Sequence, residues 1–365
     1  MASNPISNSA QSLIIEQFHP NRDERVLILE GGDGKLAQYV ANLIPEGAVL
    51  SLDRDIRNIW KAENTLSRIS NATTSRSVLP TSLGWDSTLL IIPKERRFAR
   101  ALLLKSWKAL KSNGQLILAG ATREGAKAVI KDAQRLFGNI SNIAYRNHQR
   151  VAKCIKGTEL PDPLPKEFQQ IGIAPDTSQF IEVQQTGHKL TLETHPGIFS
   201  WTAIDAGTSY LLENLEIQPD STVWDVGCGY GIIGLSTAIS GAKLVCMSDI
   251  NLLSVNYACR NAARNQLSEK VSVFTCDGLN IPPELKAPRS FDLILSNPAF
   301  HQGRSVDKSM SESLISSAPD RLTKHGRLVI VANRFLNYDK TMQNKFAQVT
   351  TIAENSKFHI IEAHN

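Results

Sequence analysis

The segment Ser296-Asn297-Pro298-Ala299-Phe300 carries residue types that can hold a planar amine. An Asn side-chain oxygen and the carbonyl oxygen of the next proline can accept both hydrogens of an exocyclic amino group. A nearby aromatic ring can stack on the heterocycle that bears it. These acceptors would also stabilise positive charge that develops as the nitrogen attacks an electrophile. We therefore expect Asn297, Pro298 and Phe300 to be catalytic in group transfer to an amine.

A glycine-rich turn lies upstream of this segment, in Asp225-Val226-Gly227-Cys228-Gly229-Tyr230-Gly231. Glycines let the backbone turn sharply after a strand and let a ligand approach the N-terminus of the next helix. The residues from Gly229 to Gly234 also fit the pattern GxGxxG, and Asp249 follows at the spacing of a dinucleotide site. A nicotinamide cofactor is therefore one candidate ligand of this turn.

Three acidic residues favour S-adenosylmethionine as the ligand instead. Asp225 precedes the glycines, where a carboxylate would repel a pyrophosphate but could organise the cationic amino-acid end of the methyl donor. Asp249 could accept both ribose hydroxyls, and Asp277 could meet the adenine amino group. Each alone could be a helix cap or a turn residue. Together, at successive predicted strand ends, they indicate methyl transfer, and we expect Asn297 to contact the bound donor as well, beside its sulfur.

Both halves of the chain alternate strand-like runs with helical periods, which is typical of a parallel sheet covered by helices. A first strand is expected at 26–29 and again at 222–224, followed by a glycine turn and helices at 35–43 and 232–240. Further buried strands are expected at the positions 48–53, 87–92 and 114–118 in one half, and 243–249, 291–296 and 326–331 in the other. The chain therefore carries a duplicated fold.

The two copies meet near Pro161, Pro163 and Pro165, which cannot continue a helix or a central strand. We expect a degenerate methyltransferase-like domain at 1–160, a linker or extension at 161–194, and a catalytic domain at 195–365.

The first copy lacks the chemistry of the second. An alignment of the two turns pairs Glu30, Gly32 and Gly34 with Asp225, Gly227 and Gly229. It pairs Leu36 with Gly231, and Ile92, which cannot accept a hydrogen bond, with Asn297. We therefore expect the first domain to have lost catalysis and to serve folding, substrate docking or both.

Charge is distributed unevenly along the chain. Residues 1–160 hold 23 Lys and Arg against 14 Asp and Glu, whereas the remainder holds 17 against 21. A basic first half could meet a polyanion, because phosphate contacts supply most of the affinity for nucleic acids. The same residues could equally be solvated helix faces. The densest stretch holds Lys94, Arg96, Arg97, Arg100, Lys105, Lys108 and Lys111.

The five cysteines, Cys154, Cys228, Cys246, Cys259 and Cys276, have no CxxC spacing. They indicate reduced cytosolic thiols and no zinc site. We see neither a signal-peptide pattern nor about eighteen consecutive apolar residues. A cytoplasmic protein without a membrane segment or a metal is expected.

The chain resembles the tandem-domain ribosomal RNA guanine-N2 methyltransferases, chiefly the small-subunit type C. The resemblance rests on Pro196-Gly197-Ile198-Phe199-Ser200, on Asp205-Ala206-Gly207-Thr208, on the glycine turn and on the Asn-Pro-x-Phe-His turn. It implies two Rossmann-like class I domains with mostly parallel seven-stranded sheets, the first degenerate. It also implies that Phe199 and Ser200 border the cofactor. Ala299 stands where the family has a second proline, which loosens the turn and adds an N–H donor.

The resemblance implies that the chain methylates N2 of a guanine in ribosomal RNA, with 16S RNA favoured and S-adenosylmethionine as donor. Ribosomal RNA or a ribosomal subunit would be its partner, and it would act as a monomer. Other planar amines remain open: a 23S guanine, adenine N6 or a protein glutamine. So does a non-catalytic RNA-binding or assembly factor that keeps the fold.

Overall fold

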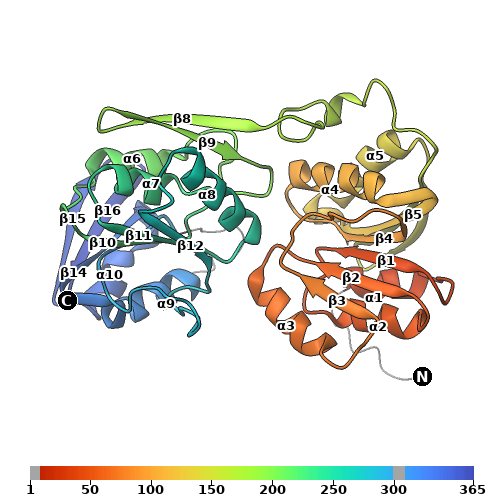
Figure 1. Cartoon of the computed structure of the whole chain (residues 1–365), viewed down its shortest axis with the longest axis horizontal. Helices are drawn as coiled ribbons and strands as arrows, with labels where there is room; N and C mark the ends of the chain where they lie inside the picture. Colours follow the sequence, from red (N-terminus) through yellow and green to blue (C-terminus); the bar gives the residue numbers. More distant parts are fainter. Residues whose placement is uncertain (1–8, 299–308) are drawn as a thin grey trace. The chain divides into compact units, whose positions relative to one another are not determined.

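The protein is described by a computed structural model that covers residues 9–298 and 309–365. The chain divides between Ser178 and Gln179 into two compact α/β units, shown in Figure 1. Each unit contains one seven-stranded, mostly parallel sheet with helices on both faces. The predicted duplicated α/β fold is confirmed.

The sheet of the first unit has the strand order β3-β2-β1-β4-β5-β7-β6. Its neighbours are parallel from β3 to β5, and β7 and β6 pair antiparallel at one edge. The strands are β1 (Arg25–Leu29), β2 (Ala48–Leu52), β3 (Ala72–Ser75), β4 (Trp85–Ile91), β5 (Leu110–Ala121), β6 (Ser141–Arg146) and β7 (Gln149–Ile155). The central strands are nearly continuous apolar runs, as expected for strands buried on both faces.

In the described part of this unit, the sheet is covered by α1 (Ser9–Gln17), α2 (Lys35–Leu43), α3 (Ile56–Leu66), α4 (Arg96–Ala109) and α5 (Ala126–Phe137). The helices α1 and α2 bury apolar side chains against one face, with Ile14, Val40 and Ile28 at or near zero exposure. The helices α4 and α5 pack against each other and against the strands β5 and β7. Burial of this kind is the main favourable term in folding.

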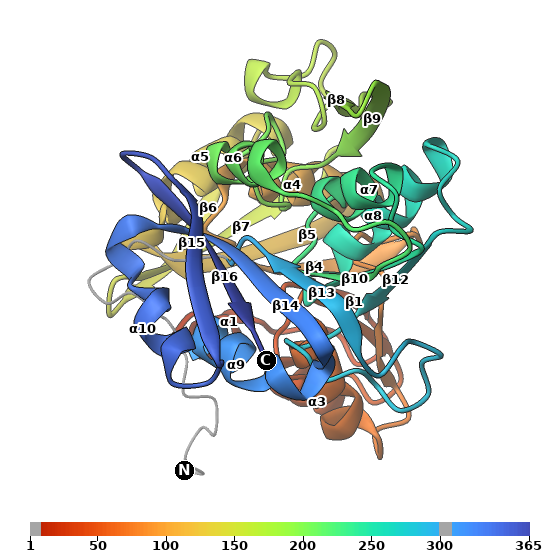
Figure 2. The same cartoon turned by 90° about the vertical axis from the view of Figure 1, so that its left-hand side faces the viewer.

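The second unit repeats the arrangement with the strand order β12-β11-β10-β13-β14-β16-β15. Figure 2 faces its antiparallel edge, formed by β14, β16 and β15. The strands are β10 (Thr222–Val226), β11 (Leu244–Asp249), β12 (Val271–Thr275), β13 (Phe291–Ser296), β14 (Leu322–Asn333), β15 (Gln348–Glu354) and β16 (Phe358–His364). Because position for position the strand orders agree, the two halves share one topology.

The helices of the second unit are α6 (Ala206–Asn214), α7 (Ile232–Ile239), α8 (Leu252–Arg264), α9 (Ser309–Ser317) and α10 (Tyr338–Gln343). The helices α9 and α10 close a core around Trp224 and Phe291, which are fully buried with ring centroids 4.9 Å apart. The Trp224 indole N–H donates to Ser248 Oγ at 2.9 Å, so its one polar atom is satisfied. This core fixes the strands whose ends form the site.

The segment 161–194 is more structured than the extended linker that we expected. Its last part forms a two-stranded antiparallel hairpin, β8 (Gln179–Gln185) and β9 (His188–Thr194), within the second unit. In the described part of the chain, no helix is long and apolar enough to cross a membrane.

Candidate active site

The candidate site lies at the carboxyl edge of the second sheet, where the parallel strands β12, β11, β10 and β13 end side by side. The strand β10 stands between β11 and β13, so the chain order reverses at this point. Open α/β sheets bind ligands outside the carboxyl ends of the strands at such a switch point. The ends of β10, β11 and β13 carry Asp225, Asp249 and Asn297.

The glycine turn connects β10 to α7 and needs glycine at three positions. Gly227, Gly229 and Gly231 have φ values of 78°, 56° and 93°, which favour glycine. A Cβ at Gly231 would lie 3.3 Å from the Ala258 Cβ in α8, so this glycine lets two helices approach closely. A Cβ at Gly227 would meet no atom within 4 Å. The backbone at Gly227 is therefore open to a ligand.

Asp225 is fully buried at the end of β10. Its Oδ2 accepts a hydrogen bond from the Gly234 N–H at 2.8 Å. Its Oδ1 is buried without a hydrogen-bond partner among the described residues. Burial, helped by the nearby Asp249 and opposed by the Gly234 N–H, raises the pKa of Asp225 to about 7. A buried acceptor without a donor is the feature that a cationic ligand, or a water beside it, would satisfy.

Asp249 braces the glycine turn. Its Oδ2 accepts from the Gly229 N–H at 3.0 Å and its Oδ1 from the Asn251 N–H at 2.8 Å. Burial raises the pKa of Asp249, and these N–H donors oppose the rise. The Ser254 hydroxyl and the Ile250 N–H also hydrogen-bond to this carboxylate, so residues of the chain already share its acceptor sites. Asp277 is half-buried just beyond the end of β12, two residues after the strand's last residue.

Asn297 follows β13 directly and is held by two residues from α6 and its N-cap. Its Nδ2 donates to Asp205 Oδ2 and to Thr208 Oγ1, both at 2.9 Å. A carboxylate only accepts hydrogen bonds, so the amide nitrogen must face Asp205. The oxygen Oδ1 then points away from these partners, and no residue that the structure describes donates to it. The neighbouring Ser296 Oγ donates to the Val226 carbonyl at 2.8 Å, which joins the two strand ends.

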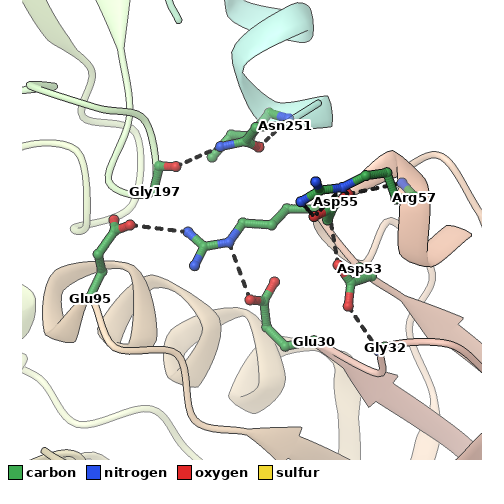
Figure 3. Close-up of polar contacts among 10 residues, drawn as sticks. Glu30, Gly32, Asp53, Asp55, Arg57, Glu95, Gly197 and Asn251 are labelled. Atoms are coloured by element: carbon green, nitrogen blue, oxygen red, sulfur yellow. Dashed lines mark hydrogen bonds and ion pairs between the residues drawn. The ribbon is translucent and has the colours of Figure 1, made fainter. Parts of the chain in front are cut away.

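The remaining predicted residues occupy different surroundings. Pro298 is buried next to Asn297, whereas Phe300 lies outside the described residues. Phe199 is 62% exposed, and Ser200 has a φ of 49°. The segment that carries them is joined to the loop after β11, because Asn251 Nδ2 donates a hydrogen bond to the Gly197 carbonyl at 2.8 Å (Figure 3). The structure thus links Phe199 and Ser200 to the Asp249 end of the site.

Sequence reasoning gave no role to Asp205, Thr208 or Asn251. Asp205 and Asn251 are the N-caps of α6 and α8, and each side chain accepts from a backbone N–H of its helix. A polar residue before a predicted helix is a recognisable cap signal. That signal predicts the local bond but not the long-range one to Asn297 or to Gly197. Among the residues described, no group of three or more His, Cys, Asp or Glu could hold a metal ion.

Comparisons with known proteins agree with this geometry. Residues 189–362 match the family described as methyltransferase small domain. The ribosomal RNA small subunit methyltransferase C of Shewanella pealeana is 31% identical over 285 residues, which cover 77% of this chain and 78% of the relative. That of Chromohalobacter salexigens is 29% identical over 87% of this chain and 88% of the relative. The chain belongs to the ribosomal RNA small subunit methyltransferase C family.

A solved structure is similar to this methyltransferase over nearly its whole length. The T. thermophilus 16S rRNA N2 methyltransferase RsmC, in complex with AdoMet and guanosine, superposes with a TM-score of 0.79. The match covers 98% of this chain and 92% of the other at 24% sequence identity. Both units therefore have the class I S-adenosylmethionine-dependent methyltransferase fold, as expected.

The first unit of the methyltransferase corrects the alignment of the two turns. Gly34 is the N-cap of α2 with φ 86°, as Gly231 is the N-cap of α7. Asp53 Oδ2 accepts from the Gly32 N–H at 2.8 Å (Figure 3), and Asp249 Oδ2 accepts from the Gly229 N–H in the same way. The pairing of Glu30 with Asp225 and of Leu36 with Gly231 is therefore wrong by two residues, because spacing alone could not fix the register.

In the corrected register Ile28 replaces Asp225. The pairing of β1 with β2 gives Ile28 the same position in its sheet that the pairing of β10 with β11 gives Asp225. When the pairing of β1 with β4 is compared with that of β10 with β13, the residue that corresponds to Asn297 is Ile91, not Ile92. Isoleucine cannot accept a hydrogen bond at either position. The expectation that the first unit lacks the acceptors therefore holds with different residues.

Glu30 takes the position of Gly227 and fills the space that this glycine leaves open. It has a φ of 56°, and Arg54 Nε lies 3.2 Å from its Oε2 (Figure 3). Arg54 also lies over the Phe98 ring, 4.6 Å from its centroid, and donates to Glu95 Oε1 at 3.4 Å. Burial raises the pKa of Glu30 to about 7 even though Arg54 lowers it. In the first unit, the Arg54 guanidinium is therefore the cation beside the buried carboxylate of the turn.

The basic stretch of the first unit is partly neutralised by ion pairs. Asp132 is fully buried and accepts from Arg96 and Arg100, each at 2.8 Å. Lys94 pairs with Glu124 at 3.2 Å, and Lys111 with Asp86 at 2.7 Å. These pairs reduce the charge that the stretch can offer to a polyanion. Arg97 and Lys108 are exposed members of it.

Proposed function

We propose that the second unit transfers the methyl group of S-adenosylmethionine to the exocyclic N2 of a guanine in 16S ribosomal RNA. Two relations support the substrate. The family's members are named for small-subunit ribosomal RNA. The T. thermophilus enzyme of the same fold acts on N2 in 16S rRNA and was solved with guanosine.

The observation that carries the proposal is the fixed amide of Asn297. Its nitrogen is engaged by Asp205 and Thr208 at 2.9 Å each, so its oxygen is the atom left to meet a substrate. An oxygen at this position can accept a hydrogen from an exocyclic amine but repels a carbonyl. The next carbonyl, that of Pro298, can accept the second hydrogen.

The residues of the glycine turn fit the donor. The unpartnered Oδ1 of Asp225 suits the cationic amino-acid end, and the open backbone at Gly227 leaves room for it. The Asp249 carboxylate at the end of β11 suits ribose hydroxyls, which would take the place of one of its present donors, and Asp277, beyond the next strand, suits the adenine amino group. When bound, S-adenosylmethionine supplies an electrophilic methyl group on a sulfonium. We propose that Phe199 and Ser200 border it, and that Gly229 and Gly231 shape the turn.

In the reaction the chain holds and polarises the acceptor amine. The oxygens of Asn297 and Pro298 accept its two hydrogens, which orients the nitrogen lone pair and stabilises the positive charge that develops on it. Phe300 would stack on the base and hold it out of the RNA stack. The loose turn expected from Ala299 leaves both acceptors in place.

The division of labour between the units follows the contrast between their turns. We propose that residues 195–365 catalyse, that residues 1–160 dock RNA or support the fold, and that 161–194 connects them. We also propose that the protein acts in the cytoplasm, where its ribosomal RNA substrate would be found. We propose a monomer, because one chain contains every proposed catalytic residue.

The test is methyl transfer from labelled S-adenosylmethionine to small ribosomal subunits that lack the modification. Nucleoside mass spectrometry should identify N2-methylguanosine. Asn297→Ala should lower kcat by about 100-fold or more, the usual effect of removing one preorganised hydrogen-bonding group. Its donor affinity, measured by calorimetry, should fall far less than kcat, because most of the proposed contacts to the donor come from the glycine turn, Asp225 and Asp249.

Three outcomes would contradict the proposal. A labelled product at another atom, such as adenine N6, would move the activity to another planar amine. Donor binding without transfer to any RNA would remove the catalytic function. An Asn297→Ala variant as active as the unsubstituted chain would remove the amide from the mechanism.

A further inference from the structure

The orientation of the Asn297 amide is set from a distant part of the chain. Asp205 and Thr208 precede it by 92 and 89 residues, and both contact the same nitrogen. An Asn amide can present either its oxygen or its nitrogen, and the two differ by a rotation of the group. With two acceptors on one side, the nitrogen is held there. Rotation would place the amide oxygen against the Asp205 carboxylate, which is repulsive.

The two anchoring residues are themselves fixed. Asp205 is the N-cap of α6, and the same Oδ2 that accepts from Asn297 also accepts from the Thr208 N–H at 3.0 Å. Thr208 is only 5% exposed, in the first turn of the helix. Gly207 leaves room for the carboxylate, since a Cβ there would lie 3.0 Å from Asp205 Oδ2. The helix N-terminus and the amide thus share one acceptor.

We infer that Asp205 and Thr208 are positioning residues that fix the Asn297 amide with its oxygen toward the substrate amine. This inference rests on the proposed function, because it assigns a reason to the geometry of Asn297. Neither residue needs to contact the donor or the RNA. Their effect reaches the reaction through one amide, and misplacement of a reacting group by about 1 Å can lower a rate 100-fold.

Substitutions at Asp205 can separate this role from helix capping. Serine caps helices about as well as aspartate but is too short to reach Asn297. Asparagine caps equally well, and its oxygen can take both hydrogen bonds. Asp205→Ser should therefore lower kcat about tenfold or more, whereas Asp205→Asn should retain most of the activity. The melting temperatures of the two variants should agree.

Thr208 offers an independent pair of variants. Thr208→Val keeps the shape of the side chain and removes the acceptor, and Thr208→Ser keeps the acceptor. We expect Thr208→Val to lower kcat about tenfold and Thr208→Ser to restore it. The Kd for S-adenosylmethionine and the KM for ribosomal subunits should stay within about twofold in both. If Asp205→Ser lowers the melting temperature strongly, the Thr208 pair decides.

A double-mutant comparison tests the route of the effect. If both residues act through Asn297, then Asp205→Ser and Thr208→Val should lower the residual activity of Asn297→Ala no further. Full additivity in that background would overturn the inference, as would a kcat within twofold of the unsubstituted chain for both single variants. Absence of transfer by the unsubstituted chain would instead overturn the proposed function.

Discussion

At the scale of single residues, the buried carboxyl group of Asp225 makes donor binding sensitive to pH. Its pKa is raised to about 7, so in the unliganded chain it is protonated below this pH and ionised above it. A cationic ligand binds the ionised form. The affinity for S-adenosylmethionine should therefore rise as the pH increases toward 7, by up to about tenfold per pH unit, and then level off.

Calorimetry between pH 5.5 and pH 7.5 would measure this dependence, and Asp225→Asn should abolish it. The folding stability of the unliganded chain depends on pH in the opposite direction. Because the folded, unliganded chain binds the proton more tightly than the unfolded chain, Asp225 lowers stability as the pH rises from about 4 to about 7. Asp225→Asn should thus raise the melting temperature at pH 8 while it weakens donor binding. A flat affinity profile for the unsubstituted chain would contradict this assignment.

The sequence predicted those site residues whose partners are close along the chain. The glycines and Asp225 form one turn, and Asn297 follows a buried apolar run that ends abruptly in a polar residue. The anchors of its amide were missed because they meet it only when the fold brings the start of α6 to the end of β13. The register of the first turn was also wrong, because two short glycine patterns align equally well at two offsets.

At the scale of elements, Gly234 in α7 shows packing overriding helix propensity. In a helix interior, alanine is more stable than glycine by about 1 kcal/mol. A Cβ at Gly234, however, would lie 2.4 Å from Met247 Sδ and 3.1 Å from Asp225 Oδ2. Overpacking of this kind costs about 1–3 kcal/mol. Gly234→Ala should therefore lower the melting temperature and weaken donor binding, because the Gly234 N–H supports Asp225.

Gly157→Ala provides the control for thermal denaturation. A Cβ at Gly157 meets no atom within 4 Å, so this substitution should change the melting temperature little. Equal effects of the two substitutions would show that the contact with Met247 does not decide the stability of α7.

The sequence predicted the central parallel strands of both sheets closely, but it named none at the antiparallel edges formed by β6, β7, β15 and β16. Apolar runs bounded by turn residues placed β13 at its observed limits, and α2 likewise. The hairpin β8–β9 was missed because its turn lacks the usual Asn-Gly or Asp-Gly signal. The turn consists of Thr186 and Gly187 with φ values of 46° and 80°, and threonine seldom adopts such a conformation.

At the scale of the whole molecule, two copies of one topology differ in what occupies the turn after the first strand. The second copy has an open glycine there, and the first has Glu30 paired with Arg54. We therefore expect one S-adenosylmethionine per chain in calorimetry. Glu30→Gln should leave the stoichiometry and the Kd unchanged, whereas Asp225→Asn should weaken binding. A second equivalent of bound donor would contradict this assignment.

The tethered guanidinium of Arg54 has a consequence for a cell short of methionine. A ligand that binds only the folded state stabilises it by mass action, so its loss lowers stability. Arg54, unlike S-adenosylmethionine, is covalently part of the protein, so it remains beside Glu30 whatever the nutrient supply. During starvation the half of the enzyme that depends on a diffusible metabolite would become easier to unfold and degrade, while the half with a built-in counter-ion would not.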